Sequence, residues 1–342
     1  MTLADFPRVR LTHAPTPFEP LPNLTRELGG PRLFVKRDDC TGLAMGGNKA
    51  RQLEFYFGEA KAQNADTIII TGAVQSNFLR MTAAAAAKLG LACEIQREDR
   101  VPDMAEDYHS SGNVLLDQLL GCKIHTFPEG EDEKAADVAL ERVADLIRAE
   151  GRRPYVIHLS EEHPPIGALG YIDAAREILD QAAHVGVKVD LVVVPSGSAL
   201  THVGALVGLR LLQSKIPVLG ICVRRDREQQ AERVLRRASE TAELVGRPGI
   251  VDQDDVWVDD KVLAPGYGRL NDATTEAILL AARSEGLLVD PVYSGKTLAG
   301  LIALVRDGRI ATDSNVVFLH TGGTPALFGY QNLLARATDG SA

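Results

Sequence analysis

The sequence is poor in cysteine and in long apolar runs. Its 342 residues include four cysteines, with no Cys-x-x-Cys pair and no His/Cys cluster at zinc-ligand spacing. No run approaches the roughly 20 apolar residues that span a bilayer, and the first residues lack the pattern of a secretory signal. We therefore expect a cytoplasmic protein with no metal site and no membrane partner. The cysteines, which we expect to be reduced and buried as small hydrophobic residues, are Cys40, Cys93, Cys122 and Cys222.

Basic residues are also in deficit. The chain has 37 Lys and Arg against 46 Asp and Glu, a formal net charge of −9. Nucleic acids and anionic membranes bind basic surfaces, so this charge argues against both as partners. A small anionic substrate needs only a local cationic pocket and is still allowed. Hydrophobic residues make up 45% and charged residues 24%, which excludes intrinsic disorder.

Short apolar runs alternate with helical stretches along the whole chain. Residues 131–150 carry apolar side chains at helical spacing, and the alanine-rich segment 77–89 is a second clear helix; Gly151 and Gly90 are expected to end them. The strand candidates are 33–36, 67–71, 92–96, 123–126, 155–158, 191–195, 218–223 and 315–319. This order predicts an α/β fold of parallel sheets with helices on both faces. Because the alternation restarts after about Ile166, we expect two domains with a ligand cleft between them.

The first loop with chemical character is 45–51, Met-Gly-Gly-Asn-Lys-Ala-Arg. Its glycines let a ligand approach the backbone closely, and Asn48 is a good N-cap for a helix that starts at Lys49. The helix dipole and burial would both lower the pKa of Lys49, as a lysine that attacks an aldehyde requires. The alternative is an ordinary glycine turn with a solvated lysine.

Two further loops join a strand to a helix. In 71–80, amides at the helix start together with Ser76 and Asn77 would suit a substrate carboxylate; plain N-capping by Ser76 is the alternative. In 194–204, amides and hydroxyls would form a phosphate cup, with a capped strand-to-helix turn as the alternative. The second loop is neither a Walker A loop nor a Gly-x-Gly-x-x-Gly fingerprint, so a nucleotide-dependent enzyme lacks its motif.

Three glycine-bearing loops lie near the end of the chain, at 264–268, 290–296 and 320–325. Two of them contain a tyrosine, Tyr267 or Tyr293. A tyrosine offers a flat stacking face and a hydroxyl that can move protons. Aromatic residues that close the core are the alternative.

Together these loops resemble a known set. GGNK at 46–49, SN at 76–77, SGSALTHVG at 196–204, APGYG at 264–268, DPVYSGK at 290–296 and HTGG at 320–323 occur in the order found in pyridoxal-phosphate enzymes of fold type II. The chain is most similar to the family of D-cysteine desulfhydrase and 1-aminocyclopropane-1-carboxylate deaminase, over nearly its whole length. The resemblance implies a tryptophan synthase β-like fold, with a large cofactor-binding domain at 1–50 and 166–342 and a small domain at 51–165. It also implies pyridoxal 5'-phosphate as the cofactor, a small anionic amino acid as the substrate, and a homodimer.

The resemblance assigns roles to individual residues. Lys49 would bind the cofactor covalently and then act as the base at the substrate Cα, with Ser76, Tyr267 and Tyr293 as the other catalytic side chains. The cofactor would be held by Asn77 at its phenolic oxygen, by Gly197, Ser198, Leu200 and Thr201 at its phosphate, and by Ser294 and Thr321. The substrate would contact Ser76, Asn77, the amide of Phe78, Ser160, His163 and Tyr267.

Ser294 narrows the expected reaction. In this family its position lies beside the pyridine nitrogen, where the deaminase carries a glutamate whose charge keeps that nitrogen protonated. A serine holds the proton less firmly, which favours loss of a leaving group from Cβ over ring opening. A serine that only caps the following helix is the alternative.

Departures from the family pattern bear on the leaving group. Desulfhydrases usually carry a histidine where this chain has Phe78, and a glycine/serine loop where it has 158–167. The pattern looks most like that of the L-cysteate sulfo-lyases, which release pyruvate, sulfite and ammonium; D-cysteine desulfhydrase is the main alternative, and an inactive amino-acid-binding module is a further one. The donors proposed for a sulfonate are Ser160, His163, Tyr267 and Thr321, with Arg80 either a further donor or part of a salt bridge.

Overall fold

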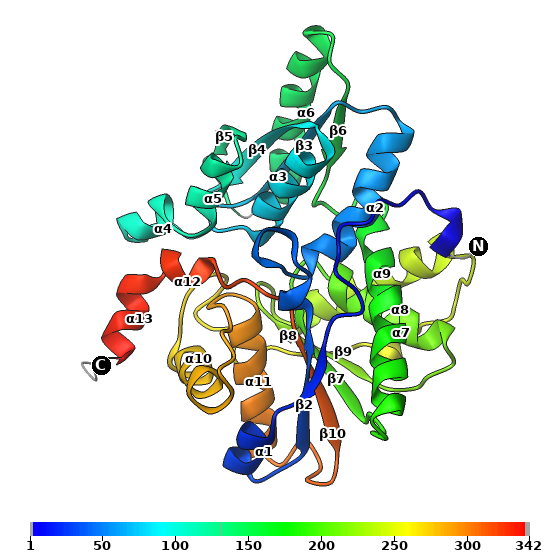
Figure 1. Ribbon diagram of the computed structural model, residues 1–342, viewed down its shortest axis with the longest axis vertical. Helices are drawn as coiled ribbons and strands as arrows, with labels where there is room; N and C mark the ends of the chain where they lie inside the picture. Colours follow the sequence, from blue (N-terminus) through cyan, green and yellow to red (C-terminus); the bar gives the residue numbers. More distant parts are fainter. Residues whose placement is uncertain (1–2, 131, 339–342) are drawn as a thin grey trace. The chain divides into compact units, whose positions relative to one another are not determined.

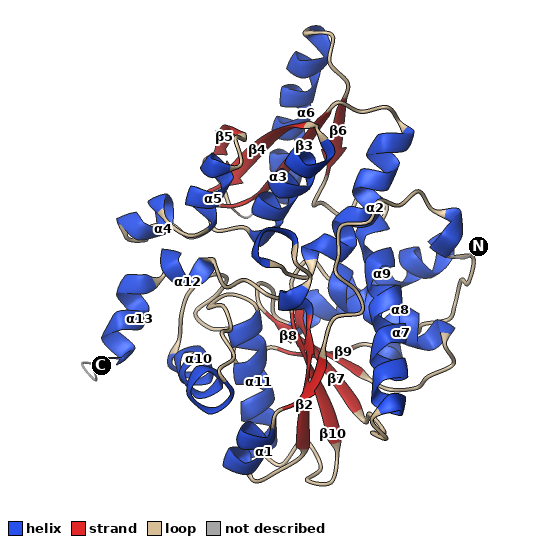
Figure 2. Cartoon of the chain, viewed as in Figure 1, coloured by secondary structure: helices blue, strands red, loops and turns tan. Residues whose placement is uncertain are grey.

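The computed structural model describes residues 3–130 and 132–338, which form two compact units. The first unit consists of His13–Asn48 and Pro165–Thr324. The second consists of Lys49–Pro164 together with the described parts of both chain ends, 3–12 and 325–338. Each unit is a parallel sheet with helices on both faces, so the predicted fold class is confirmed (Figures 1 and 2).

The sheet of the first unit has six strands in the order β1-β2-β10-β7-β8-β9. The strands are β1 (Phe18–Pro20), β2 (Arg32–Arg37), β7 (Leu191–Ser196), β8 (Val218–Cys222), β9 (Trp257–Asp259) and β10 (Asn315–His320). Only β1 runs antiparallel, against β2. Every residue of β7 and β10 is buried because helices cover both faces of the sheet, which explains the continuous apolar runs in these strands.

Six helices form the outer layers of the first unit. They are α1 (Pro22–Leu28), α7 (Leu169–His184), α8 (Leu200–Leu211), α9 (Arg227–Leu244), α10 (Asp272–Glu285) and α11 (Ser294–Arg306). Helices α7, α8 and α9 pack together on one face, and α1, α10 and α11 on the other (Figure 1). Close packing of α8 on α7 depends on Gly204 and Gly208, where an added Cβ would collide with Ala168 and with Ile172 and Ala175.

The second unit contains an all-parallel sheet in the order β5-β4-β3-β6. Its strands are β3 (Thr67–Ala73), β4 (Ala92–Glu98), β5 (Lys123–Phe127) and β6 (Pro154–Ile157). Its helices are α2 (Lys49–Ala62), α3 (Asn77–Leu89), α4 (Glu106–Ser110), α5 (Asn113–Leu119), α6 (Glu133–Ala149), α12 (Ala326–Gly329) and α13 (Gln331–Thr338). Helix α3 packs on β3 and β4, while α6 packs on β3 and β6 through a buried cluster of Ile69, Leu140, Ala144 and Ile147.

All eight predicted strands are present, and so are the two predicted helices. The first residue of the predicted helix 131–150 lies outside the described residues, and the helix begins at Glu133 as α6. Gly90 and Gly151, at φ 72° and 81°, follow the ends of α3 and α6 as predicted. Strands β1 and β9 were not predicted, because three residues are too short for a recognisable apolar pattern.

The cysteines are free, but their burial differs from the prediction. Cys222 is buried as expected, whereas Cys40 is exposed and Cys93 and Cys122 are half-buried. The prediction of a buried hydrophobic role is therefore wrong for Cys40, which is the exposed last residue of a short helical turn. Within 3–130 and 132–338, no helix is both long and apolar enough to cross a bilayer. The same residues contain no group of three or more His, Cys, Asp or Glu side chains that could hold a metal ion.

Candidate active site

The loop before Lys49 has a strained backbone. Four consecutive residues, Ala44 to Gly47, have φ values of 43°, 68°, 69° and 132°. Residues with side chains rarely adopt positive φ values, and such a conformation persists only where the surrounding structure enforces it. Here Gly47 donates its amide to Asp38 O at 3.0 Å and to Thr41 Oγ1 at 2.8 Å. The loop is therefore fixed in one shape immediately before helix α2 begins.

Asn48 ties the end of this loop to two other predicted site loops. Its amide donates to Thr321 O at 3.0 Å, and its side-chain Nδ2 donates to Thr201 Oγ1 at 2.9 Å. These bonds join the loops at Asn48, Thr201 and Thr321 within the first unit. Lys49 follows Asn48 directly in the chain and is the first residue of α2, as the sequence predicted.

The amine of Lys49 is easier to deprotonate than that of an ordinary lysine. Burial lowers its pKa from 10.5 to about 8, which confirms the direction expected from the sequence. The Nζ atom donates to Gln52 Oε1 at 3.1 Å and lies 4.6 Å from the centroid of the Phe78 ring. Neither Gln52 nor Phe78 carries a negative charge that would stabilise the protonated amine of Lys49. The sequence did not point to Gln52, which lies one turn further along α2 and is fully buried.

Ser76 caps helix α3. Its Oγ atom accepts hydrogen bonds from the amides of Phe78 and Leu79 at 3.2 and 3.3 Å. The structure thus shows the N-cap that the sequence analysis gave as the alternative role of Ser76. The amide of Phe78 donates to this cap. This hydrogen bond helps to fix the first turn of α3, which carries Asn77.

Two buried side chains orient the Asn77 amide. Its Oδ1 atom accepts hydrogen bonds from Arg80 Nη1 and Asn113 Nδ2, each at 3.0 Å. Because these donors occupy the oxygen, the Nδ2 group of Asn77 points away as a donor. Arg80 also donates to Asn113 Oδ1 at 2.9 Å and is fully buried. Asn113, 36 residues from Asn77, was not found from the sequence.

Ser160 and His163 lie in the loop that follows β6. The Ser160 amide donates to Asp137 Oδ2 at 3.1 Å, and its side chain is only 3% exposed. Among the described residues, the Ser160 hydroxyl has no hydrogen-bond partner. The His163 ring stacks on His158 with centroids 3.6 Å apart, and both burial and that neighbour lower its pKa. This loop therefore holds a histidine of lowered pKa and an unused buried donor.

The predicted phosphate loop enters α8 through a left-handed residue, Ala199, at φ 73°. Two carbonyls of this loop are taken up by arginines: Gly197 O accepts from Arg225 at 3.2 Å, and Ser198 O accepts from Arg233 at 3.4 Å. Nothing in the described part of the chain accepts a hydrogen bond from the amides of Gly197, Ser198 or Leu200. A strained turn with unused amides at the start of a helix is a good anion site.

A buried network supports this loop from below. Gln230 donates to Ser196 Oγ at 2.8 Å, and that hydroxyl lies 3.1 Å from His202 Nδ1. His202 Nε2 lies 3.0 Å from Val218 O, a carbonyl, so the hydrogen bonds assign the proton of the neutral ring to Nε2. Burial lowers the pKa of His202 to about 4. None of these three side chains was identified as functional from the sequence.

Tyr267 and Tyr293 are brought together as the sequence suggested. Their hydroxyls are 2.8 Å apart and their rings meet edge to face. The loop that carries Tyr267 is held by Lys296, whose Nζ donates to Leu263 O and Gly266 O at 3.0 Å each. Burial lowers the pKa of Lys296 to about 8. Because the amine of Lys296 donates to backbone carbonyls, we assign this second lysine a structural role.

Ser294 opens helix α11 and is fully buried. Its hydroxyl lies 2.6 Å from Asp290 Oδ1 and 3.1 Å from Gly322 O, and it accepts the Asp290 amide at 2.8 Å. Thr321 is buried beside Gly322, and its carbonyl accepts the Asn48 amide. Ser294 is thus the first residue of α11 but does not cap it, because its hydroxyl accepts no amide of the helix. The amides of Val292, Tyr293 and Ser294 donate instead to the carboxylate of Asp290, a residue that the sequence analysis had not assigned.

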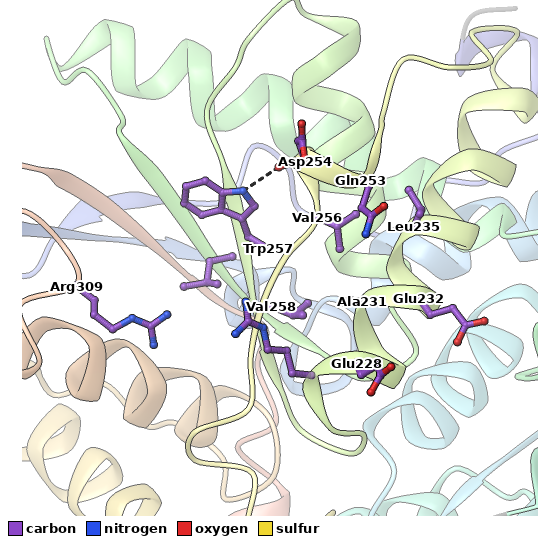
Figure 3. Close-up of a pocket in the computed structure, with 12 residues that line it drawn as sticks. Glu228, Ala231, Glu232, Leu235, Gln253, Asp254, Val256, Trp257, Val258 and Arg309 are labelled. Atoms are coloured by element: carbon purple, nitrogen blue, oxygen red, sulfur yellow. Dashed lines mark hydrogen bonds between the residues drawn. The ribbon is translucent and has the colours of Figure 1, made fainter.

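An open groove lies elsewhere in the first unit, beside the edge strand β9. It has a volume of about 710 Å³ and is lined by Trp257 together with side chains of α9 and by Arg309 (Figure 3). A smaller cavity of about 340 Å³ lies in the second unit against the start of β4. Neither is lined by a residue predicted for the site.

Comparison with known proteins identifies the family. Residues 9–322 match the family described as "Pyridoxal-phosphate dependent enzyme". D-cysteine desulfhydrases of Salmonella choleraesuis (strain SC-B67) and Salmonella typhi are each 44% identical over 328 residues, covering 96% of this chain and 97% of each relative. A crystal structure of an ACC deaminase homologue is 37% identical, with a TM-score of 0.87 and 97% of each chain covered. O-ureido-L-serine synthase, 16% identical with a TM-score of 0.67, shares the fold.

The chain belongs to the pyridoxal-phosphate-dependent enzymes, in the family of D-cysteine desulfhydrase and ACC deaminase. It is a pyridoxal-phosphate-dependent lyase. The residues present fit this cofactor: the unused amides at 197–200 suit its phosphate, and the lysine of lowered pKa suits its aldehyde. Asn77 supplies an oriented donor suited to its phenolic oxygen.

Proposed function

We propose that this lyase eliminates a sulfur leaving group from Cβ of a three-carbon amino acid. The observation that carries the proposal is the residue at 294. A buried serine whose hydroxyl is bonded to Asp290 adds no charge of its own where the deaminase, by resemblance, carries a glutamate. A less firmly protonated ring favours elimination at Cβ over chemistry that needs a long-lived carbanion.

Each side chain then has a specific task. Lys49 Nζ binds the cofactor and removes the proton from the substrate Cα; its pKa of about 8 leaves a useful neutral fraction near neutral pH. When bound, pyridoxal phosphate supplies the electron sink for that step. The amides of Gly197, Ser198 and Leu200, with the Thr201 hydroxyl, hold the phosphate.

The remaining predicted residues act on the substrate. Ser76 and Asn77 bind its carboxylate at the start of α3. The paired hydroxyls of Tyr267 and Tyr293, 2.8 Å apart, hold or pass a proton near the departing sulfur. Ser294 and Thr321 complete the cofactor contacts. A homodimer stays a prediction from the resemblance, and a cytoplasmic location stays a prediction from the sequence itself.

D-cysteine is the substrate that the names of the relatives support, at 44% identity over 96% of the chain. L-cysteate is a second candidate, and one observation favours it. The buried Ser160 hydroxyl finds no hydrogen-bond partner in the part of the chain that the structure describes, and its loop also carries His163. A sulfonate has three acceptor oxygens and would use such donors, whereas a thiol would not need them.

The test begins with Lys49→Ala, and Lys61→Ala at the exposed end of the same helix is the matched control. We expect the purified wild-type protein and the control to show a visible absorption band that borohydride bleaches, and Lys49→Ala to lack it. A band that persists in Lys49→Ala would contradict the assignment.

The substrate is tested by assaying D-cysteine, L-cysteine and L-cysteate side by side, with pyruvate, sulfide and sulfite as the measured products. Sulfide from D-cysteine supports the desulfhydrase, and sulfite equal to pyruvate supports the sulfo-lyase. In the second case, Ser160→Ala should raise KM for L-cysteate by about tenfold, the loss of one hydrogen bond to a charged group. Binding of all three without pyruvate would instead identify an inactive binding module.

A further inference from the structure

Two cysteines lie side by side in the sheet of the second unit. Strands β4 and β5 are parallel, and their register pairs Glu94 with Lys123. Cys93 and Cys122 immediately precede these two residues. The Cys122 thiol is close enough to raise the pKa of Cys93, and both residues are half-buried and free.

The strand geometry places the two sulfur atoms on the same face of the sheet. Glu94 and Lys123 form an ion pair of 3.2 Å, so their side chains share one face. Side chains alternate along a strand, so Cys93 and Cys122 share the other. Neighbouring strands are about 4.8 Å apart, and disulfides join Cα atoms separated by roughly 4.4–6.8 Å. A disulfide therefore needs little movement of the backbone.

A small oxidant can reach this position. The cavity of about 340 Å³ at the start of β4 is lined by Cys93 and by Gly121, which directly precedes Cys122. The other two cysteines have different surroundings. Cys40 is exposed, and Cys222 is buried in β8 of the first unit.

We propose that Cys93 and Cys122 form a reversible disulfide when the protein meets a hydroperoxide. One thiolate attacks a peroxide oxygen, so an S–O bond forms, the O–O bond breaks and an alcohol (or water) leaves after protonation. The second thiol then attacks that sulfur, so the S–S bond forms and water leaves. Two thiols are oxidised and one peroxide is reduced; a dithiol reverses the change.

The surroundings of the pair set the pH dependence of its oxidation. The Cys122 thiol, burial and the charges of Asp117 and Glu94 all raise the pKa of Cys93. Lys123 and Arg152 form ion pairs with Glu94, His125 Nε2 lies 2.8 Å from the same carboxylate, and Arg97 pairs with Asp117. Because the thiolate is the reactive form, we expect the disulfide to form faster as the pH rises above neutral.

The disulfide lies away from the predicted substrate residues of the same unit. Cys93 and Cys122 are at the amino-terminal ends of parallel strands, whereas Ser76 and Asn77 follow the carboxyl end of β3. The new bond would join the edge strand β5 to its neighbour. We therefore expect oxidation to raise the thermal midpoint and to leave the cofactor absorption band unchanged.

The test uses the full-length holoenzyme treated with hydrogen peroxide at several pH values. Peptide mapping without reductant should recover the Cys93 peptide linked to the Cys122 peptide, and a dithiol should release both. Cys93→Ser and Cys122→Ser should form no intramolecular link. Cys40→Ser is the matched control and should form it at the wild-type rate.

Some outcomes would overturn the proposal. These are the absence of the Cys93–Cys122 peptide at a peroxide concentration that oxidises Cys40, or the same gain in thermal midpoint in Cys93→Ser. Because the mapping is done on the wild-type protein, a variant that fails to fold does not affect that result. A wild-type protein that forms the link but lacks the band of the Lys49-bound cofactor would sink the proposed function alone.

Discussion

Asp290 and Ser294, both fully buried, are joined by three hydrogen bonds within one turn. The Ser294 amide and hydroxyl approach Asp290 Oδ1 at 2.7 and 2.6 Å, and the Asp290 amide donates to the Ser294 hydroxyl at 2.8 Å. The other carboxylate oxygen accepts the amides of Val292 and Tyr293. No Lys or Arg in the described part of the chain forms a salt bridge with Asp290. Its charge is instead stabilised by amides at the start of α11.

This arrangement opposes conversion of Ser294 to the glutamate of the deaminase. Ser294→Glu would place a second carboxylate beside the buried one. We expect the free energy of unfolding to fall by about 3 kcal/mol or more, as for an uncompensated buried charge. Ser294→Ala should cost about 1 kcal/mol. Urea unfolding at pH 7 measures both variants, and equal stability of the two would contradict the interpretation.

The lowered pKa of Lys49 predicts how cofactor uptake depends on pH. Only the neutral amine attacks an aldehyde, and burial brings the pKa from 10.5 to about 8. Below pH 8 the amine is mostly protonated and uptake is slow, whereas above pH 8 it is mostly neutral. The rate at which the apoprotein takes up pyridoxal phosphate should therefore rise through pH 8 and level off by about pH 9. A rate that still rises above pH 10 would show an unperturbed lysine.

The hydrogen bonds of Asn77 separate its folding role from its role toward the cofactor. Asn77→Asp keeps an oxygen facing Arg80 and Asn113 but loses the Nδ2 donor. We expect it to keep wild-type stability while shifting the cofactor absorption band and weakening cofactor binding by about tenfold. Asn113→Leu should instead lower stability by about 1–3 kcal/mol, because Arg80 and the backbone carbonyl of Gln75 lose their Asn113 side-chain partners. If Asn77→Asp lost much stability and kept the wild-type cofactor absorption band, Asn77 would have a folding role and no role toward the cofactor.

Much of the fold could be predicted because its signals are local. The runs 191–195 and 315–319 are continuous and apolar because both faces of their strands are buried. Asn77–Leu89 could be bounded at both ends, since Ser76 and Gly90 provide cap chemistry at a fixed spacing. Lys49 could also be placed at the start of a helix from the Asn48 that precedes it, although the Asn48 side chain donates to Thr201 in the structure and is not seen to cap α2.

The rest of the site could not be predicted because its contacts join residues far apart in the chain. Asn113 orients Asn77 across 36 residues, and Asn48 meets Thr201 across 153. Nothing near Lys296 indicates that its amine holds the backbone of the Tyr267 loop. A polar residue that supports a site is recognised by the residues to which it is hydrogen-bonded. Those partners are distant in the sequence, so they become known only once the fold is known.

His202 predicts loss of stability in acid. Burial lowers its pKa from 6.5 to about 4, so between these values the unfolded chain binds a proton that the folded chain does not. Stability is therefore full above pH 6.5 and falls as the pH drops toward 4, by about 3 kcal/mol for this group. Urea unfolding at pH 7 and pH 4.5 should show a smaller difference for His202→Gln than for the wild type. The exposed His109→Gln is the control and should keep the wild-type difference. If His202→Gln also keeps it, the histidine is protonated in the folded protein and cannot accept the Ser196 hydroxyl.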